Sequence, residues 1–261
     1  MSQPIIAIEN ASKSYRNGQQ LALNDVSIQI EPATFVAVVG ASGSGKTTLL
    51  KTMNRLADVD TGVVRVSGAA VNGVPGHELR RRVGYVFQGI GLFPHLTVAE
   101  NIGITPRLLG WDAGQIVSRV EELADLVALP RSLLRRLPAD LSGGQQQRVG
   151  VARALAAKPA ILLMDEPFGA LDPITRDALG TQVRNLHDAM ELTTVMITHD
   201  VLEAVLLADR IVVMRAGRII ADGPPHTLLA GHPDEDVRAL MEMPRRQAER
   251  VRAVLERNSR G

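Results

Sequence analysis

A glycine-rich loop lies between an apolar run and a helix-forming segment in the N-terminal part of this chain. The loop reads Gly40-Ala41-Ser42-Gly43-Ser44-Gly45-Lys46-Thr47-Thr48 and matches the phosphate-binding pattern G-x-x-x-x-G-K-[ST]. Composition alone yields this pattern in roughly one chain of this size in a hundred, so a plain glycine-serine turn is the alternative. Residues 35–39 before the loop predict a buried strand, and residues 47–53 after it predict a helix start. That order favours a phosphate site over a plain turn.

The residue types in this loop suit the phosphates of a nucleotide. Glycines let backbone N–H groups point inward around an anion, and the helix N-terminus adds a partial positive charge. Lys46 is able to reach the β- and γ-phosphates, and the hydroxyl of Thr47 is a ligand for Mg²⁺. The loop therefore predicts binding of a nucleotide together with Mg²⁺.

Composition limits the other classes of function. The chain has 261 residues, 45% hydrophobic and 22% charged, which suffices for one large domain or two small ones. Its formal net charge of +1 provides no general attraction to nucleic acid. It has no cysteine, which excludes disulfides and thiolate metal sites and fits a reducing cytosol. No signal-peptide pattern and no apolar run near ~18–20 residues is present, so we expect any work at a membrane to need a partner.

Polar residues follow three further apolar runs, where each also has a purely structural alternative. They are Asp165-Glu166 after residues 160–164, Gln88 after residues 83–87, and His199 after residues 194–198. Beside a phosphate loop, Asp165 is able to hold Mg²⁺, and Glu166 to orient or deprotonate an attacking water. Gln88 is able to place its amide on Mg²⁺ or on that water. His199 is expected at the edge of the sheet where α/β ligand sites form.

Strand-forming stretches between residues 5 and 30 predict an antiparallel region ahead of the loop, with a turn at Asn17-Gly18. Tyr15 belongs to this region. It is either a strand aromatic that packs on its neighbours or a face on which adenine stacks, and this region alone favours neither.

Residues 93–158 have the character of a mostly helical insertion. Thr97 to Glu100 form a capping-box pattern that predicts one helix start. A second start is predicted at Ser142, followed by Gly143, Gly144 and Gln145, in a helix that stops near Pro159. Two glycines in a first turn weaken a helix by up to ~1 kcal/mol each relative to alanine. Exposure of N–H groups to an anion is a reason for that cost.

Together these motifs resemble the ATP-binding subunits of ABC transporters over essentially the whole chain. The loop is similar to Walker A, Gln88 to the Q-loop, residues 141–148 to the LSGGQ signature, residues 161–166 to Walker B, residues 170–172 to the D-loop and His199 to the switch histidine. The resemblance also favours the adenine-stacking role of Tyr15, and it adds Asp172 and the signature residues to the nucleotide site.

The resemblance implies an α/β P-loop ATPase core with an N-terminal antiparallel β region and a helical subdomain. We expect an ATPase domain over residues 1–242, with the subdomain at about 93–158, and a short basic helical tail over 243–261. Catalysis is expected from Glu166, His199 and Lys46, with metal ligands Thr47, Gln88 and Asp165. No core motif departs from the family pattern, so an active ATPase is expected and not a regulatory remnant.

The resemblance also implies partners. A second ATPase subunit, a copy or a paralogue, would complete the site head to tail. The expected location is the cytoplasmic face of the membrane, bound to permease subunits and indirectly to an extracytoplasmic solute-binding protein, with no nucleic acid. ABC ATPases of DNA repair or translation are disfavoured because their long coiled-coil insertions or paired cassettes are missing, and a non-catalytic module is disfavoured by the intact acids.

A narrower resemblance connects the chain to importers of quaternary-amine osmoprotectants such as glycine betaine, choline and carnitine. It rests on residues 51–56, 90–95, 169–176 and 244–247. Many such subunits carry CBS domains after the ATPase, and the expectation here is a short form without them. An importer of amino acids, polyamines or inorganic anions is the competing interpretation, since the solute is selected by other subunits.

Overall fold

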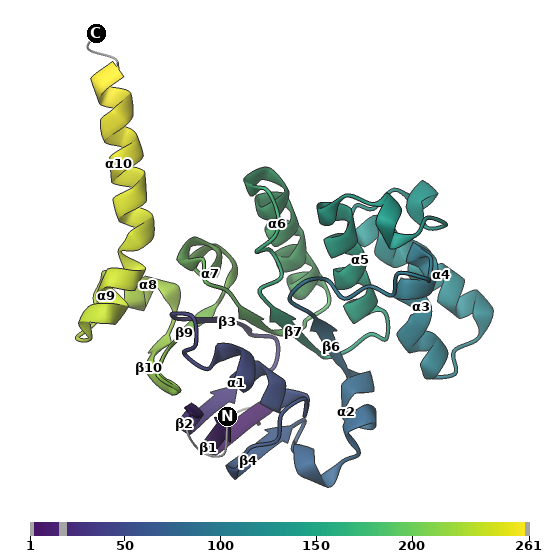
Figure 1. The fold of residues 1–261 in the computed structure, drawn as a ribbon, viewed down its shortest axis with the longest axis horizontal. Helices are drawn as coiled ribbons and strands as arrows, with labels where there is room; N and C mark the ends of the chain where they lie inside the picture. The colour runs from purple at the N-terminus through teal and green to yellow at the C-terminus, as the bar shows by residue number, and fades with distance from the viewer. Residues whose placement is uncertain (1–2, 16–19, 259–261) are drawn as a thin grey trace.

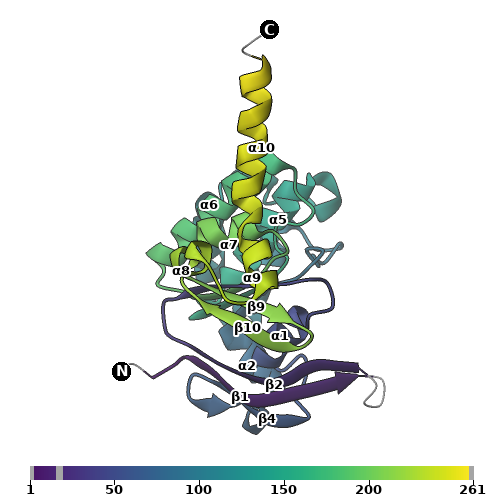
Figure 2. The same ribbon diagram turned by 90° about the vertical axis from the view of Figure 1, so that its left-hand side faces the viewer.

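The computed structural model describes residues 3–15 and 20–258, so the predicted turn at Asn17-Gly18 lies outside the described residues. Two sheets form separate layers (Figures 1 and 2). The first is antiparallel, with strand order β2-β1-β4-β5. Its strands are β1 (Ile6–Tyr15), β2 (Gln20–Ile30), β4 (Thr61–Val66) and β5 (Ala69–Ala70). The predicted antiparallel region ahead of the loop is therefore present.

The second sheet has strand order β10-β9-β3-β8-β7-β6 and is parallel except for β10 at its edge. Its strands are β3 (Phe35–Val39), β6 (Val83–Val86), β7 (Ile161–Asp165), β8 (Thr193–Ile197), β9 (Arg210–Arg215) and β10 (Arg218–Gly223). Parallel strands end at one edge, so the segments that follow β3, β6, β7 and β8 meet there.

The parallel sheet is buried on both faces, which explains why its strands are continuous apolar runs. In β3, Val36 and Val38 face a core shared with the antiparallel sheet, whereas Phe35, Ala37 and Val39 face a second core. Helix α1 (Lys46–Met53) belongs to the first core and packs against β2, β4, β7 and β8.

Helices cover the other face of the parallel sheet. These are α5 (Gly143–Leu155), α6 (Pro173–Ala189) and α7 (Val201–Leu207). Beyond β6, α3 (Val98–Leu108) and α4 (Ala113–Leu126) pack with α5 into a helical group (Figure 1). The short elements are α2 (Gly76–Arg82), η1 (Val71–Gly73), η2 (Arg131–Leu133) and η3 (Pro138–Asp140). Both predicted helix starts are confirmed, because Thr97 caps α3 and Ser142 caps α5.

The described C-terminal part of the chain is helical. It comprises α8 (Pro225–Ala230), α9 (Glu235–Met241) and α10 (Met243–Asn258). Helix α10 extends away from the rest of the molecule in both views (Figures 1 and 2). Two ion pairs, each between residues four positions apart, stabilise this segment. They are Arg245–Glu249 at 2.8 Å and Arg246–Glu242 at 2.5 Å. Among the described residues, no helix is both long and apolar enough to span a bilayer.

Candidate active site

The glycine-rich loop connects β3 to α1 and leaves an open helix N-terminus. Gly45 precedes α1 with φ 104°, and a Cβ atom there would lie 2.2 Å from the carbonyl oxygen of Ala22 in β2. Only glycine fits this conformation and this close approach. Among the described residues, no side chain caps α1, and the first N–H groups of a helix have no acceptor within the helix itself. The loop therefore presents backbone donors to an anion.

Lys46 folds back over the loop. Its Nζ donates hydrogen bonds to the carbonyls of Gly40 at 2.8 Å and Ala41 at 2.9 Å. Burial lowers the pKa of Lys46, and the nearby Glu166 and Asp165 oppose that shift. The hydroxyl of Ser44 is buried without a hydrogen-bond partner in the described part of the chain. Uncapped N–H groups, this hydroxyl and the ammonium together fit a phosphate.

Asp165 ends β7 beside the first turn of α1. The Thr47 hydroxyl lies 3.1 Å from its Oδ1, and the Tyr85 hydroxyl lies 3.5 Å from its Oδ2. Burial raises the pKa of the Asp165 carboxyl. Hydroxyl and carboxylate oxygens are the ligands that Mg²⁺ prefers, and a cation would offset the cost of burying this carboxylate. Thr47 and Asp165 therefore fit Mg²⁺.

Glu166 brings together two of the predicted residues. It turns out of the strand with φ 46°, and its N–H donates to the carbonyl of Ile197 at 3.0 Å. Its Oε2 accepts a hydrogen bond from Gln88 Nε2 at 3.1 Å and lies 3.6 Å from His199 Nδ1. The amide of Gln88 thus contacts Glu166, not the Thr47–Asp165 pair.

Tyr15 lies at the end of β1, close to the loop. The neighbouring pair Ser14–Leu21 aligns this strand end with the Ala22 carbonyl that contacts Gly45. The ring is 41% exposed, and Lys13 Nζ lies 5.6 Å from its centroid. An exposed aromatic face at this position is available to a nucleotide base.

The signature residues lie on a different helix. Ser142 and Gln145 form a reciprocal capping box, with Gln145 N to Ser142 Oγ at 3.3 Å and Ser142 N to Gln145 Oε1 at 3.0 Å. A Cβ atom on Gly144 would lie 2.7 Å from Thr175 Cγ2, so close packing on α6 is a second reason for glycine there. Asp172 caps α6 by accepting from Thr175 N at 3.0 Å.

Within the described residues of one chain, no hydrogen bond joins the signature to the phosphate loop. Helix α5 packs on α3, α4, α6 and β6, whereas α1 packs on β2, β4, β7 and β8. The chain therefore collects Lys46, Thr47, Asp165, Glu166, Gln88 and His199 along one sheet edge and leaves residues 142–145 elsewhere.

Sequence reasoning missed Tyr85 and Arg176. Tyr85 lies within the apolar run of residues 83–87, and the β6–β7 pairing that places it beside Asp165 has no sequence signal. Arg176 lies in the first turn of α6 and forms ion pairs with Asp200 and Glu203, which flank the His199 loop. In the sequence, Arg176 appears only within residues 169–176, and nothing there indicates these partners.

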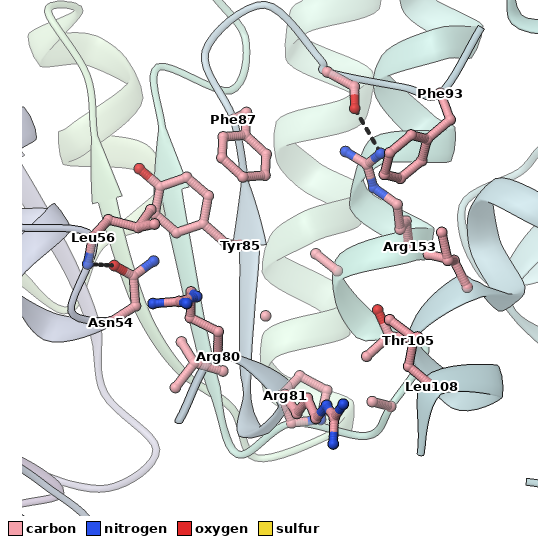
Figure 3. A pocket seen from close by; sticks show the side chains of 17 residues that line it. Asn54, Leu56, Arg80, Arg81, Tyr85, Phe87, Phe93, Thr105, Leu108 and Arg153 are labelled. Carbon is pink, nitrogen blue, oxygen red and sulfur yellow. Dashed lines mark hydrogen bonds between the residues drawn. The ribbon is translucent and has the colours of Figure 1, made fainter. Parts of the chain in front are cut away.

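A groove of about 570 Å³ opens between β6 and the helical group (Figure 3). Tyr85 and Phe87 form an aromatic pair with ring centroids 4.6 Å apart. Across from them, Cζ of Arg153 lies 5.9 Å from the ring centroid of Phe93, and Nη1 of Arg153 donates to the carbonyl of Gly91 at 2.7 Å. Phe87 and Phe93 are both more than two-fifths exposed. The groove is apolar, and Phe87 in its wall directly precedes Gln88 in the chain.

A parallel sheet, a phosphate loop with its lysine, and acids at the end of a neighbouring strand define a P-loop nucleoside triphosphatase. A family model described as ABC transporter matches residues 23–169, more than half of the chain. The chain belongs to the ABC transporter family and is an ATP-binding ATPase of that family.

Curated relatives agree with this assignment. The choline transport ATP-binding protein OpuBA of Bacillus subtilis is 46% identical over 233 residues, which cover 89% of this chain and 61% of OpuBA. The glycine betaine uptake system ATP-binding protein YehX of Escherichia coli is 47% identical over 234 residues, which cover 90% of this chain and 75% of YehX. The chain thus spans about three-fifths of OpuBA and three-quarters of YehX.

Solved structures show the same fold. The dimeric ABC transporter cassette MJ0796 has a TM-score of 0.77 and 32% identity, covering 84% of this chain and 98% of that one. A post-hydrolysis state of that cassette, bound to ADP and Pi, has a TM-score of 0.76 and 31% identity. The expected α/β P-loop fold is confirmed.

Proposed function

We propose that this chain is the ATP-hydrolysing subunit of an importer that takes up a quaternary-amine osmoprotectant through a separate membrane permease. The observation that carries the catalytic part is the position of Glu166, whose Oε2 is shared by Gln88 and His199 beside the phosphate loop. An acid held in this way is suited to orient and deprotonate a water that attacks the γ-phosphate.

The loop and the residues around it have separate roles in this proposal. Residues 40–48 bind the phosphates through backbone N–H groups, and Lys46 exchanges its two carbonyl contacts for phosphate oxygens. Thr47 and Asp165 would hold Mg²⁺, with Gln88 as a further ligand once its amide turns from Glu166. The metal supplies charge that offsets the negative charge developing on the phosphoryl oxygens. His199 donates to the same oxygens, and Tyr15 stacks on adenine.

The site is completed by a second subunit. Residues 142–145 are remote from residues 40–48 within one chain, yet α5 offers a capped N-terminus with two glycines. In a head-to-tail dimer, this N-terminus and Asp172 would close over the nucleotide of the partner. The dimeric cassette with a TM-score of 0.77 supports such an assembly.

The apolar groove supports a membrane partner. Phe87 is exposed at its wall, and the next residue, Gln88, reaches Glu166. A permease segment in this groove would sense and set the position of the amide that contacts the catalytic acid. The chain would then work at the cytoplasmic face of the membrane, with an extracytoplasmic solute-binding protein beyond the permease.

The solute class rests on the relatives named for choline and glycine betaine. Such cations are typically held by several aromatic rings through cation–π contacts. This chain has only one Trp and two Tyr, so we assign solute recognition to the partner subunits.

Reconstitution tests the solute. The chain, its permease and its binding protein in vesicles should hydrolyse ATP faster when glycine betaine or choline is added, and the isolated chain should show no binding of either by calorimetry. Stimulation by an amino acid, polyamine or sulfate, with no response to any quaternary amine, would instead assign the chain to an importer of that other solute.

A further inference from the structure

Arg176 connects two loops that end at the candidate active site. It lies in the first turn of α6, and its Nη2 donates to the carbonyl of Leu171 at 3.2 Å. Leu171 immediately precedes Asp172, the cap of α6. One side of the guanidinium is therefore attached to the segment that leads into α6.

The other side of the guanidinium faces the loop that carries His199. Nη1 lies 3.5 Å from Asp200 Oδ2, and Nε lies 3.6 Å from Glu203 Oε1. Asp200 follows His199 directly and caps α7. Glu203 accepts a hydrogen bond from the hydroxyl of Thr198 at 2.6 Å, and Thr198 precedes His199. The two carboxylates that contact Arg176 thus hold the loop on both sides of His199.

Burial makes this cluster sensitive to loss of the arginine. The side chain of Glu203 is only 13% exposed and that of Arg176 only 28%. Burial raises the pKa of Glu203, while the hydrogen bond from Thr198 and the charge of Arg176 act in the opposite direction. Without the guanidinium, two neighbouring carboxylates would repel each other and turn toward water, which moves the loop they support.

We propose that Arg176 is a positioning residue that sets the approach of His199 to Glu166, now 3.6 Å between Nδ1 and Oε2. The inference rests on the proposed function, because it takes His199 and Glu166 as the groups that act on the γ-phosphate and the water. Arg176 itself contacts neither of them, and it acts through Asp200, Glu203 and Thr198.

The same helix provides a matched control. Arg184 lies on α6, and its side chain is also 28% exposed. Arg176 and Arg184 both line a second groove, of about 530 Å³, between α6 and α7. It pairs with Asp188 and Asp209, both at 2.8 Å, and donates to the carbonyl of Leu207 at 2.8 Å. Asp188 lies on α6 itself, and Leu207 and Asp209 lie at the end of α7 that is remote from His199. Loss of Arg184 removes comparable ion pairs without touching the catalytic loop.

The test compares Arg176→Gln, Arg176→Lys and Arg184→Gln in the full chain, at a protein concentration where the rate per subunit has saturated. We expect Arg176→Gln to lower kcat about tenfold with KM for MgATP changed less than about twofold, because the reacting groups are misplaced and the loop still binds phosphate. Arg184→Gln should lower the melting temperature to a similar degree and keep kcat. Arg176→Lys retains the charge and should recover part of kcat.

A double-mutant cycle with His199→Ala separates positioning from general weakening. If Arg176 acts through His199, adding Arg176→Gln to His199→Ala should cause no further loss of kcat. Independent, multiplicative losses overturn the inference. The inference is also overturned if Arg176→Gln keeps kcat, as Arg184→Gln is expected to, while His199→Ala loses turnover. That outcome leaves the proposed function intact. Full turnover in His199→Ala would instead show that His199 has no catalytic role. It would then also overturn the proposal that Arg176 acts by positioning His199.

Discussion

The side-chain amide of Gln88 lies 3.1 Å from Oε2 of Glu166, which joins the wall of the apolar groove to the acid at the end of β7. Phe87 lines that groove, and Gln88 is the next residue in the chain. A displacement of this segment would therefore also move the Gln88 amide that donates to Glu166. The contact would provide a short path between a proposed partner in the groove and the proposed site of hydrolysis.

This contact predicts that Gln88→Ala uncouples hydrolysis from the solute. We expect the variant to bind ATP normally, because the phosphate loop is untouched, but to lose most of the solute-dependent increase in ATPase rate in reconstituted vesicles. The measurement is the ratio of rates with and without solute. A ratio equal to that of the unmodified chain would show that the groove is not linked to Glu166 through Gln88.

Replacement of Glu166, the proposed catalytic base, should separate binding from turnover. Glu166→Gln keeps the size of the side chain but removes the base, so kcat should fall by about 10²–10⁴ while ATP still binds. The variant should accumulate as an ATP-bound dimer on size exclusion. Lys46→Ala is the contrasting change and should weaken nucleotide binding itself. Turnover near the normal rate in Glu166→Gln would disprove the assignment of the base.

The remoteness of Ser142 from Lys46 within a chain predicts complementation between two inactive variants. Lys46→Ala and Ser142→Arg should each be inactive alone, because every site in their dimers is damaged. In a mixed dimer, one site combines the intact loop of one subunit with the intact signature of the other. Random mixing should therefore restore up to about a quarter of the normal rate.

Two observations would contradict this composite site. One is full ATPase activity in a strictly monomeric preparation, and the other is a rate per subunit that does not change with protein concentration. The Ser142→Arg chain must also be shown to fold, since loss of an N-cap costs about 1 kcal/mol. Its thermal unfolding provides that control.

The Thr47–Asp165 contact predicts a selective effect on Mg²⁺. Thr47→Val keeps the shape of the side chain but removes the hydroxyl that lies 3.1 Å from Asp165. We expect the Mg²⁺ concentration for half-maximal hydrolysis to rise about tenfold, in line with the loss of one ligand. Thr52→Val is the matched control, since the buried Thr52 hydroxyl lies on the same helix and donates to the carbonyl of Leu49 at 2.7 Å. Equal effects of both changes would point to general disruption of α1.

Asp60 predicts a stability change at low pH. Its carboxylate accepts from Lys13 Nζ at 2.6 Å, Ser14 N at 2.7 Å and Ser14 Oγ at 2.8 Å. These contacts, the Lys13 hydrogen bond foremost, lower the pKa of Asp60 from 3.8 to about 2. A pKa that is lower in the folded state means that the carboxylate stabilises the fold above pH 3.8 and that this stabilisation is lost as the pH falls toward 2.

Asp60→Asn should therefore lower the free energy of unfolding near neutral pH, and the difference should shrink below pH 4. Because the Asp60 side chain is 41% exposed, solvent screening limits the effect to about 1 kcal/mol. Urea unfolding of both proteins at several pH values measures it. A difference that stays constant from pH 7 to pH 3 would contradict the role of the carboxylate charge.

The local features of this chain could be predicted from sequence because each depends on residues a few positions apart. The phosphate loop, the capping boxes at Thr97 and Ser142, and the apolar strand before the loop all belong to this kind. Their hydrogen bonds and backbone angles are set within one turn or one strand. The residue types at the ends of three strands could also be recognised, since they match the chemistry of phosphate transfer.

The tertiary structure alone decided which of these residues meet. Gln88, Glu166 and His199 converge only because β6, β7 and β8 are neighbours in the sheet, and strand order depends on packing between distant segments. The same packing placed Tyr85 beside Asp165 and Arg176 between two loops. It also gave Gly144 a contact with Thr175 that the anion-binding interpretation of its sequence did not include. These relationships involve side chains far apart in the chain, whose distances no spacing along the sequence encodes.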